Sequence, residues 1–553
     1  MKADDLRTKF VDFFVGKDHK LLPPASLIPE NDPSVLFTSA GMQQFKRYYT
    51  EPDQAPAKNI VTVQPCFRTS DIEAVGDDTH LTFFEMLGNF SFGGYLKKEA
   101  VEMAYEFLTD VLNIDRARIK CSIFKGDEIN ARDNQSAVIL EKMGLKYEEY
   151  SRDDNFWGPT GNEGPCGPTV EFYVDDVEVW NLVFNEYFKN ADGSYRKIDT
   201  PGVDTGMGLE RMLVVKNGLK NVYETDLFEE IFDILEKELP LKKGKDDEYL
   251  RMIADHIKAA VMIANEGILP GKNEKESVLR KLIRRAVDYS QMKEFEPAWI
   301  KEVIEIIANQ YQGINKEKVE KVIFDEAKSF SQILNKCEEI IKNRQEYSAK
   351  DAFNLFQSQG CPIRRYQDYA AMHDVKITDV DIEQEMRKHQ EISRAGVSGF
   401  KSGLVGESKI TTRMHTATHL LLKALQEVLG KEVHQRGSNI NEERIRFDFS
   451  YPEAMTEEQI KKVEEIVNQK IKEDLPVVRK ETTIEEAKKL GAEAQFLSKY
   501  GVYDKLTMYS IGDYSHELCG GPHVKTTSEI GKFKIIKEES SSAGVRRIRA
   551  VLE

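Results

Sequence analysis

The sequence predicts a multidomain α+β protein whose first part is built on an antiparallel sheet. Its 553 residues exceed what one hydrophobic core usually organises. Up to about residue 240, short β-type runs such as residues 59–63 and 177–184 alternate with glycine and proline turns and a few helices. From residue 249 to about residue 394 the pattern becomes helical and charged, with apolar residues three to four positions apart, as in residues 319–327.

Changes in composition mark the expected domain boundaries. Residues 396–406 carry four glycines, which is typical of a linker or a turn-rich entry strand. The helical run ends before this stretch, and an apolar helix follows it. The sequence thus predicts an α+β domain at 1–240, a helical domain at 241–395, a linker at 396–408 and a second α+β domain at 409–553.

Composition excludes several classes of protein. The chain has 40% hydrophobic and 31% charged residues, as globular proteins do. No apolar run approaches the roughly 20 residues of a membrane span, so we expect no membrane association. The N-terminus, residues 1–5, lacks the basic-then-apolar pattern of a signal peptide, which predicts a cytoplasmic location. Six widely separated cysteines indicate reduced thiols rather than a disulfide framework.

The net charge restricts where nucleic acid could bind. A formal charge of -16 argues against binding over the whole surface, because phosphate contacts need lysine and arginine. Any RNA contact then requires a local basic patch. The best candidate is the run 280–285, in which Arg280, Lys281, Arg284 and Arg285 alternate with apolar residues at helical spacing. The alternative is that this run is only the solvated face of a helix.

The densest pattern in the first domain lies at residues 66–71 and 82–93. It combines Arg68 with several aromatic residues and turn glycines. A nucleotide site needs a guanidinium for a phosphate and a ring that stacks on adenine, and Arg68 with Phe90 would supply both. The alternative is a hydrophobic hairpin that carries a surface arginine.

Two short pairs near the C-terminus predict a metal site. His415 and His419 open an apolar run that ends at a glycine, so they lie on one face of a predicted helix. Cys519 and His523 flank Gly-Gly-Pro, which excludes a helix and predicts a tight loop. Three imidazoles and a thiolate suit tetrahedral zinc, whereas packing histidines are the alternative for either pair alone. The spare donors in this region are His434 and His516.

These motifs resemble those of a known family. HTATH at 415–419 followed by CGGPH at 519–523 is similar to the editing domain of alanyl-tRNA synthetases, which freestanding alanyl-tRNA deacylases share. TFFEMLGNFSFG at 82–93, with the preceding Arg68, resembles motif 2 of this class II synthetase, and VDTGMGLER at 203–211 resembles its motif 3. The resemblance spans about residue 7 to the C-terminus, with further agreement at 38–46, 155–157, 164–168 and 179–184.

The resemblance implies a fold and an activity for each segment. Residues 1–240 would form a class II antiparallel-sheet catalytic domain, 241–395 a helical tRNA-recognition domain, and 409–553 a zinc-containing editing domain. The chain would attach L-alanine to tRNA(Ala) through an alanyl-adenylate, using ATP and Mg²⁺. One methyl or hydroxyl group is worth only about 1 to 3 kcal/mol, so serine and glycine escape full rejection and their tRNA(Ala) esters would need hydrolysis. The alternative is a tRNA deacylase with a decayed synthetase site.

The family pattern also implies roles for individual residues in the first domain. Arg68 would hold the ATP α-phosphate, Phe90 would stack on adenine, and Arg211 would clamp the ATP tail. Asp204 would bind the α-amino group of alanine. The walls of the alanine pocket would be Met42, Trp157, Asn181 and Gly206.

Editing and tRNA recognition would use further positions. Thr418 and Gln435 would recognise or orient a mischarged seryl ester. The zinc would either activate water or position the tRNA end, and four protein ligands favour positioning because they leave no open coordination site. For tRNA, the expected contacts are Asn273, Gln357, Arg284 and Arg285.

The sequence departs from the family pattern in three places. The motif 2 loop between Arg68 and Val75 is shorter than usual. Gln357 stands where relatives carry an aspartate that helps to read the acceptor-stem G·U pair, and Asn273 would be its partner if the loop alignment shifts by one. Glutamine both donates and accepts hydrogen bonds, so it could still read the G·U pair, and how strictly it does so is a hypothesis. The family's β-barrel and C-terminal dimerisation domain are not found, so we expect a monomer with weakened tRNA affinity or enlarged acceptor-end contacts.

Overall fold

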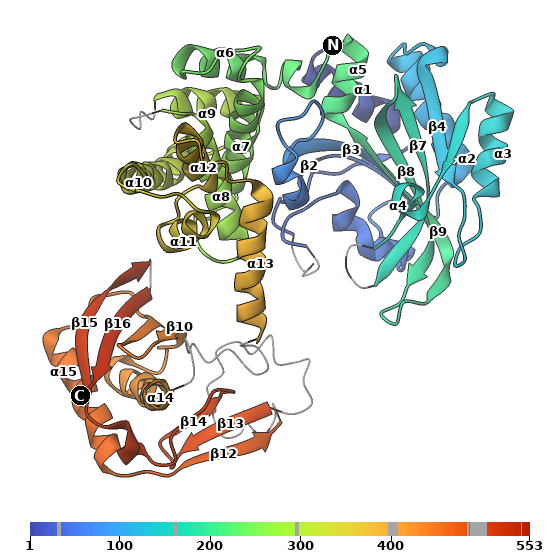
Figure 1. Ribbon diagram of the computed structural model, residues 1–553. Helices are drawn as coiled ribbons and strands as arrows, with labels where there is room; N and C mark the ends of the chain where they lie inside the picture. The colour runs from blue at the N-terminus through green and yellow to red at the C-terminus, as the bar shows by residue number, and fades with distance from the viewer. Residues whose placement is uncertain are drawn as a thin grey trace. The chain divides into compact units, whose positions relative to one another are not determined.

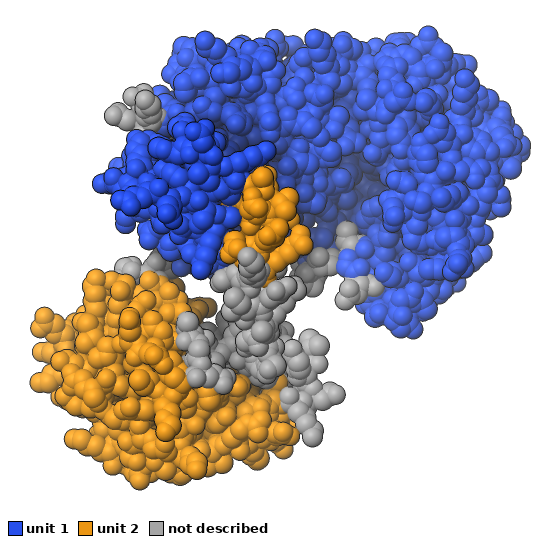
Figure 2. Space-filling model, viewed as in Figure 1, with its two compact units in different colours: residues 1–377 blue, residues 378–553 orange. Residues whose placement is uncertain are grey.

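The computed structural model describes residues 1–29, 32, 35–159, 161, 163–292, 298–395, 408–483, 486, 506–542 and 545–553. The chain forms two compact units, residues 1–377 and 378–553 (Figure 2). Each unit combines helices with sheet, which confirms the predicted α+β class (Figure 1). The predicted glycine-rich linker, apart from Ser408, lies outside the described residues.

The first unit is built on a sheet whose strands follow the order β1-β2-β3-β9-β8-β7-β4-β5, with β6 paired to β7. The inner neighbours pair antiparallel, whereas the edge pairs β1–β2 and β4–β5 are parallel. This arrangement confirms the predicted antiparallel sheet. The strands are β1 (Lys20–Leu21), β2 (Asn59–Phe67), β3 (Phe83–Phe92), β4 (Ile119–Phe124), β5 (Tyr147–Tyr150), β6 (Phe156–Trp157), β7 (Gly164–Val174), β8 (Val177–Lys189) and β9 (Tyr195–Gly208).

One face of this sheet packs against buried aromatic residues, and the other lines a cleft. Trp180 of β8 is buried, and its ring lies 5.6 Å from Phe10 and 5.8 Å from Phe107, measured between ring centroids. Because side chains alternate along a strand, the next residue, Asn181, points to the opposite face, where it lines a cleft. The helices around the sheet are α1 (Ala3–Val15), α2 (Lys97–Glu106), α3 (Asn134–Met143), α4 (Arg152–Asn155) and α5 (Leu209–Asn217), together with the 3₁₀ helix η1 (Gly41–Tyr49).

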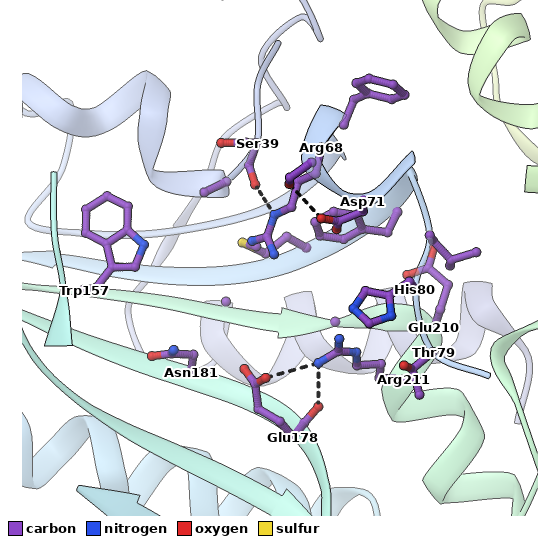
Figure 3. A pocket seen from close by; sticks show the side chains of 18 of the residues that line it. Ser39, Arg68, Asp71, Thr79, His80, Trp157, Glu178, Asn181, Glu210 and Arg211 are labelled. Carbon is purple, nitrogen blue, oxygen red and sulfur yellow. Dashed lines mark hydrogen bonds and ion pairs between the residues drawn. The ribbon is translucent and has the colours of Figure 1, made fainter. Parts of the chain in front are cut away.

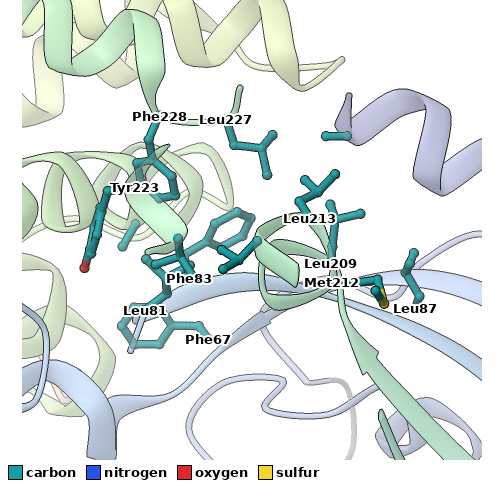
Figure 4. Close-up of a cluster of buried hydrophobic side chains, with 14 of the residues drawn as sticks. Phe67, Leu81, Phe83, Leu87, Leu209, Met212, Leu213, Tyr223, Leu227 and Phe228 are labelled. Carbon is teal, nitrogen blue, oxygen red and sulfur yellow. The ribbon is translucent and has the colours of Figure 1, made fainter. Parts of the chain in front are cut away.

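The predicted helical segment packs directly on the sheet region. One continuous cluster of buried apolar residues runs from Ala3 to Leu334, and Figure 4 shows the part where strand residues such as Phe83 meet Phe228. The boundary predicted at residue 240 falls inside this cluster, and the division there stays a prediction. The helices are α6 (Glu229–Glu238), α7 (Asp247–Asn265), α8 (Glu274–Tyr289), α9 (Ala298–Gln310), α10 (Lys316–Lys342), α11 (Ala349–Gln359) and α12 (Ile363–Met372).

The second unit holds its own core. The apolar face of α14 (Lys409–Leu429) contributes Leu420 and Leu421, which cluster with residues of α15 (Glu457–Lys472) and of a sheet ordered β10-β11-β16-β15. Three further strands pair in the order β12-β13-β14. Among the helices of the described ranges, none has the length and apolar character needed to cross a membrane. The remaining elements are α13 (Asp379–Ala395), β10 (Gln435–Ile440), β11 (Ile445–Ser450), β12 (Val477–Thr482), β13 (Leu506–Ile511), β14 (Ser515–Leu518), β15 (Phe533–Ser542) and β16 (Val545–Leu552).

Candidate functional site

A cleft of about 850 Å³ opens on the exposed face of the first sheet (Figure 3). Its floor comes from β3, β7, β8 and β9, and its rim from the segments 35–40, 68–71 and 79–81. Strands β8 and β9 pair Asn181 with Gly206, which brings two residues that are 25 positions apart onto one cross-strand row. Six of the residues predicted from the family pattern line this cleft: Arg68, Trp157, Asn181, Asp204, Gly206 and Arg211.

Two guanidinium groups enter the cleft from different elements. The Nε–H of Arg68 donates to the carbonyl oxygen of Ser39 at 3.2 Å. Arg211 follows β9 at the start of α5, and its Nη1 donates to Glu178 Oε2 at 3.1 Å. In Figure 3 the two side chains point into the cleft from opposite sides. This arrangement provides paired positive groups for a polyphosphate.

Phe90 and Met42, which the family pattern also implied, are not among the residues that line this cleft. Both are fully buried in a cluster with Phe45, and the rings of Phe45 and Phe90 have centroids 4.8 Å apart. Phe90 does lie on the correct face of β3. However, a Cβ built on Gly41 of η1 would lie 3.2 Å from the Phe90 ring, so this helix covers that end of the strand.

The aromatic ring that does line the cleft is Phe84. It lies on the same strand face as Phe90, six residues earlier, where η1 no longer covers the strand. The guanidinium carbon of Arg68 lies 5.0 Å from the centroid of the Phe84 ring. Strand alternation places Phe84, Met86, Gly88 and Phe90 on one face of β3, so Phe84 could have been proposed from the sequence. Alternation does not reveal which end of that face the rest of the chain leaves uncovered.

Buried carboxyl groups dominate the rest of the cleft. Asp204 is 6% exposed, and burial raises its pKa to about 7. Burial also raises the pKa of Glu171 to about 7, although hydrogen bonds from Tyr173 and Ser122 oppose the shift. A cationic ligand would favour the ionised form of both groups. Glu171, Glu178 and His80 also line the cleft and were missed by sequence reasoning, since single acids and histidines in strands or turns carry no motif.

The second unit gathers the four predicted metal ligands. His415 and His419 lie on α14, Cys519 and His523 follow β14, and their ligand atoms all lie within 4.8 Å of one another. The Sγ of Cys519 is 3.4 Å from His415 Nε2. The predicted combination of a helix and a loop is therefore present, and the donor set suits a tetrahedral cation.

Neighbouring groups fix which imidazole nitrogen faces the centre of this cluster. His415 Nδ1 hydrogen-bonds the carbonyl oxygen of Pro522 at 3.1 Å, and His523 Nδ1 lies 3.1 Å from Thr416 Oγ1. The Nε2 of His523 and the Nδ1 of His419 are buried without a hydrogen-bond partner among the described residues. Burial lowers the pKa of all three histidines, so the rings are neutral, as metal binding requires.

The predicted editing residues lie near this cluster in the sequence, but they are not among its ligands. The hydroxyl of Thr418 donates to the His415 carbonyl oxygen at 2.7 Å, within α14. Gln435 is half-buried on β10 and donates to Ser438 Oγ at 3.1 Å. The spare donors His434 and His516 lie outside the four-residue group, and sequence reasoning missed Thr416.

The predicted tRNA contacts lie on the helices of the first unit. Asn273 is exposed and forms the N-cap of α8, and Gln357 is exposed on α11. Arg284 and Arg285 are half-buried and already bound within the chain. Arg284 Nε donates to Glu326 at 2.6 Å, and Arg285 Nη1 donates to Glu73 at 2.7 Å. Their role in tRNA binding stays a prediction.

Comparison with known proteins shows the family to which the chain belongs. The family model "tRNA synthetases class II (A)" matches residues 5–441, and "Threonyl and Alanyl tRNA synthetase second additional domain" matches residues 506–549. The protein named "Alanine--tRNA ligase" from Borrelia hermsii (strain HS1 / DAH) is 42% identical over 593 aligned residues, which cover 100% of both chains. A relative of the same name from Treponema denticola is 42% identical over 600 residues, which cover 100% of this chain and 99% of the relative. Because these matches extend over the whole length, the chain belongs to the alanyl-tRNA synthetase family of class II aminoacyl-tRNA synthetases.

Proposed function

We propose that this protein is an ATP-dependent ligase that attaches alanine to tRNA(Ala) and hydrolyses mischarged Ser-tRNA(Ala) and Gly-tRNA(Ala). The observation that carries the synthetic activity is the cleft in which Arg68, Arg211 and the buried Asp204 come together. The family membership supports the choice of alanine and its tRNA as substrates.

The first reaction joins alanine to AMP. The carboxylate of alanine attacks the α-phosphorus of ATP, and pyrophosphate leaves from the opposite side. Negative charge grows on the phosphoryl oxygens, and the guanidinium of Arg68 neutralises it while Arg211 holds the ATP tail. Bound with ATP, Mg²⁺ would supply further neutralisation, and the cleft offers it carboxylate oxygens at Asp153, Asp154 and Glu178.

Binding groups for the two substrates lie at different parts of the cleft. The ring of Phe84, rather than that of Phe90, stacks on adenine. Asp204 accepts the α-ammonium of alanine, and Trp157 and Asn181 form the walls of the pocket. At Gly206 an added Cβ would lie 2.6 Å from Met86 Sδ, and Met86 lines the cleft, so a side chain at position 206 would displace Met86 within the pocket.

The second unit would hydrolyse mischarged tRNA(Ala). We infer that His415, His419, Cys519 and His523 bind zinc. Zinc held by four protein ligands would supply a fixed dication that positions the tRNA end, with Thr418 and Gln435 orienting the seryl ester. Asn273, Gln357, Arg284 and Arg285 stay the proposed tRNA contacts of the first unit. A monomeric state and a cytoplasmic location also stay predictions, and sedimentation at micromolar concentration tests the first.

Exchange of labelled pyrophosphate into ATP tests the synthetic site. We expect exchange to be fastest with alanine and weaker with serine and glycine. The matched pair of variants is Asp204→Asn, which should abolish exchange while Ser-tRNA(Ala) hydrolysis persists, and Cys519→Ala, which should have the reverse effect. Absence of exchange by the unmodified protein, together with hydrolysis of Ser-tRNA(Ala), would favour the alternative of a tRNA deacylase.

A further inference from the structure

The amide of Asn181 has one end bound and one end unsatisfied. Its Nδ2 donates to Glu171 Oε1 at 3.1 Å. Its Oδ1 is buried and has no hydrogen-bond partner among the described residues. A buried acceptor without a partner is costly, so its presence in a binding cleft indicates that a ligand supplies the donor.

The strands hold this amide in a row that crosses the sheet. Ser122 of β4 pairs with Glu171 of β7, Glu171 pairs with Asn181 of β8, and Asn181 pairs with Gly206 of β9. Side chains on such a row are direct neighbours. Gly206 has no side chain that could cover Asn181 from β9, and both residues line the cleft together with Met86, which lies over Gly206.

The hydrogen bonds along this row all run toward Glu171. Ser122 Oγ donates to Glu171 Oε2 at 3.0 Å, and the hydroxyl of Tyr173 donates to the same oxygen at 2.5 Å. Asn155 Nδ2 in turn donates to Ser122 Oγ at 2.8 Å, which leaves the Ser122 hydroxyl proton for Glu171. A bound cation favours the ionised form of Glu171, and an ionised carboxylate only accepts hydrogen bonds. Asn181 therefore presents its Nδ2 to Glu171 and its Oδ1 to the cleft.

We propose that Glu171 is a positioning residue that fixes the amide of Asn181, so that Asn181 Oδ1 accepts a hydrogen bond from the ammonium group of the bound alanine. This inference rests on the proposed function of the cleft. Alanine offers one donor group, its ammonium, because its carboxylate only accepts and its methyl is apolar. Glu171 itself does not touch the substrate.

Two stable adenylate analogues test this role. Alanyl and propionyl sulfamoyl adenosine differ in the ammonium group alone. The dissociation constant of the propionyl analogue divided by that of the alanyl analogue therefore measures what the ammonium group contributes to binding. Calorimetric titration of the full chain gives both constants without catalysis. In the unmodified protein we expect the alanyl analogue to bind far more tightly.

The Glu171→Gln variant should lower this ratio. A glutamine amide accepts or donates, so Asn181 can turn either end toward the cleft. We expect the ratio to fall about 10- to 100-fold, the range for one hydrogen bond to a charged group, while affinity for the propionyl analogue changes less than about threefold. In pyrophosphate exchange the same variant should raise the KM for alanine and leave the KM for ATP and kcat nearly unchanged.

The matched control is Glu148→Gln on β5. Glu148 is exposed and also accepts a hydrogen bond from the tyrosine two residues later, Tyr150, but it lies outside the cleft. Its substitution should leave the ratio unchanged. Asn181→Ala should lower the ratio without any change at Glu171, and adding Glu171→Gln to it should cause no further fall.

Two results would overturn the inference. An unchanged ratio in Glu171→Gln, or an additional fall when it is combined with Asn181→Ala, would mean that Glu171 does not act through Asn181. Failure of the unmodified protein to bind either analogue is a different outcome, since it would contradict the proposed function itself and the inference with it.

Discussion

Lys258 of α7 offers a direct test of what holds the first unit together. Its side chain is 1% exposed, and its Nζ has no hydrogen-bond partner in the described part of the chain. The ammonium lies 4.3 Å from the ring centroid of Phe228 and 5.3 Å from that of Tyr311. The buried carboxylates of Glu210 and Glu85 attract it. We predict that Lys258→Met destabilises this unit near neutral pH.

The structure supports a magnitude and a pH dependence for this change. Burial lowers the pKa of Lys258 and raises that of Glu210, each against the attraction of the other. Removing one partner of such a pair costs about 3 to 5 kcal/mol. With an unfolding entropy of about 2.1 cal/mol/K per residue, the 377-residue unit should melt about 4 to 6 °C lower.

The loss should depend on pH with a definite sign. When folding raises the pKa of a carboxyl group, the free energy of unfolding falls as the pH rises from the group's ordinary pKa to its raised pKa. Without Lys258 the pKa of Glu210 rises further, so the deficit should be present at pH 7.5. It should shrink at pH 5.5, where Glu210 is protonated in both proteins and needs no cation.

Calorimetric melting of the full chain at the two pH values measures the effect. Lys237→Met is the matched control, because this lysine is 66% exposed and pairs only at the surface with Glu238; a shift within about 1 °C is expected. Adding Glu210→Gln to Lys258→Met removes both charges and should recover most of the loss at pH 7.5. An equal loss at both pH values, or no recovery in the double variant, would refute the reasoning.

Three further predictions concern the two sites. Phe84→Leu should raise the KM for ATP in pyrophosphate exchange about tenfold through lost stacking, whereas Phe90→Leu should lower the melting temperature without a selective effect on ATP; the reverse pattern would restore Phe90 as the adenine ring. Gly206→Ala should raise the KM for alanine about tenfold, because its Cβ would meet Met86, and an unchanged KM would show that Met86 moves aside. Cys519→Ala should lose bound metal, measured by mass spectrometry of the purified protein, while pyrophosphate exchange with alanine stays normal; retention of a full equivalent of metal would remove Cys519 from the ligand set.

The sequence predicted several of the residues that gather at each site, but not which side chains the rest of the fold covers. Arg68, Asp204 and Arg211 were expected from motif resemblance, and all three line the cleft. The four candidate metal ligands were expected from residue type and spacing, which strongly constrain a helix and a tight loop, and the structure brings them together. These features depend on short stretches of chain, so they are visible without any knowledge of tertiary contacts.

Features that depend on distant contacts were not predictable in the same way. Strand alternation placed Phe90 on the cleft side of β3, but only the folded chain reveals that η1 covers that end and leaves Phe84 open. Likewise, the basic run on α8 gave no indication that Arg285 is held by Glu73, 212 positions away. Periodicity reports which face of an element is apolar and does not identify the element that covers it.

The buried cluster shared by the sheet and the helices has a consequence for protein synthesis. Arg68 directly follows β2 and Asp204 lies on β9, so both emerge from the ribosome early. Phe83, however, packs against Lys258 and Tyr311, and Phe228 packs against Lys258, and these two partners follow later. Until α7 and α9 are made, this apolar surface faces water and stays available to chaperones. The cleft therefore gains this part of the core beneath it only after roughly the first 310 residues have been translated.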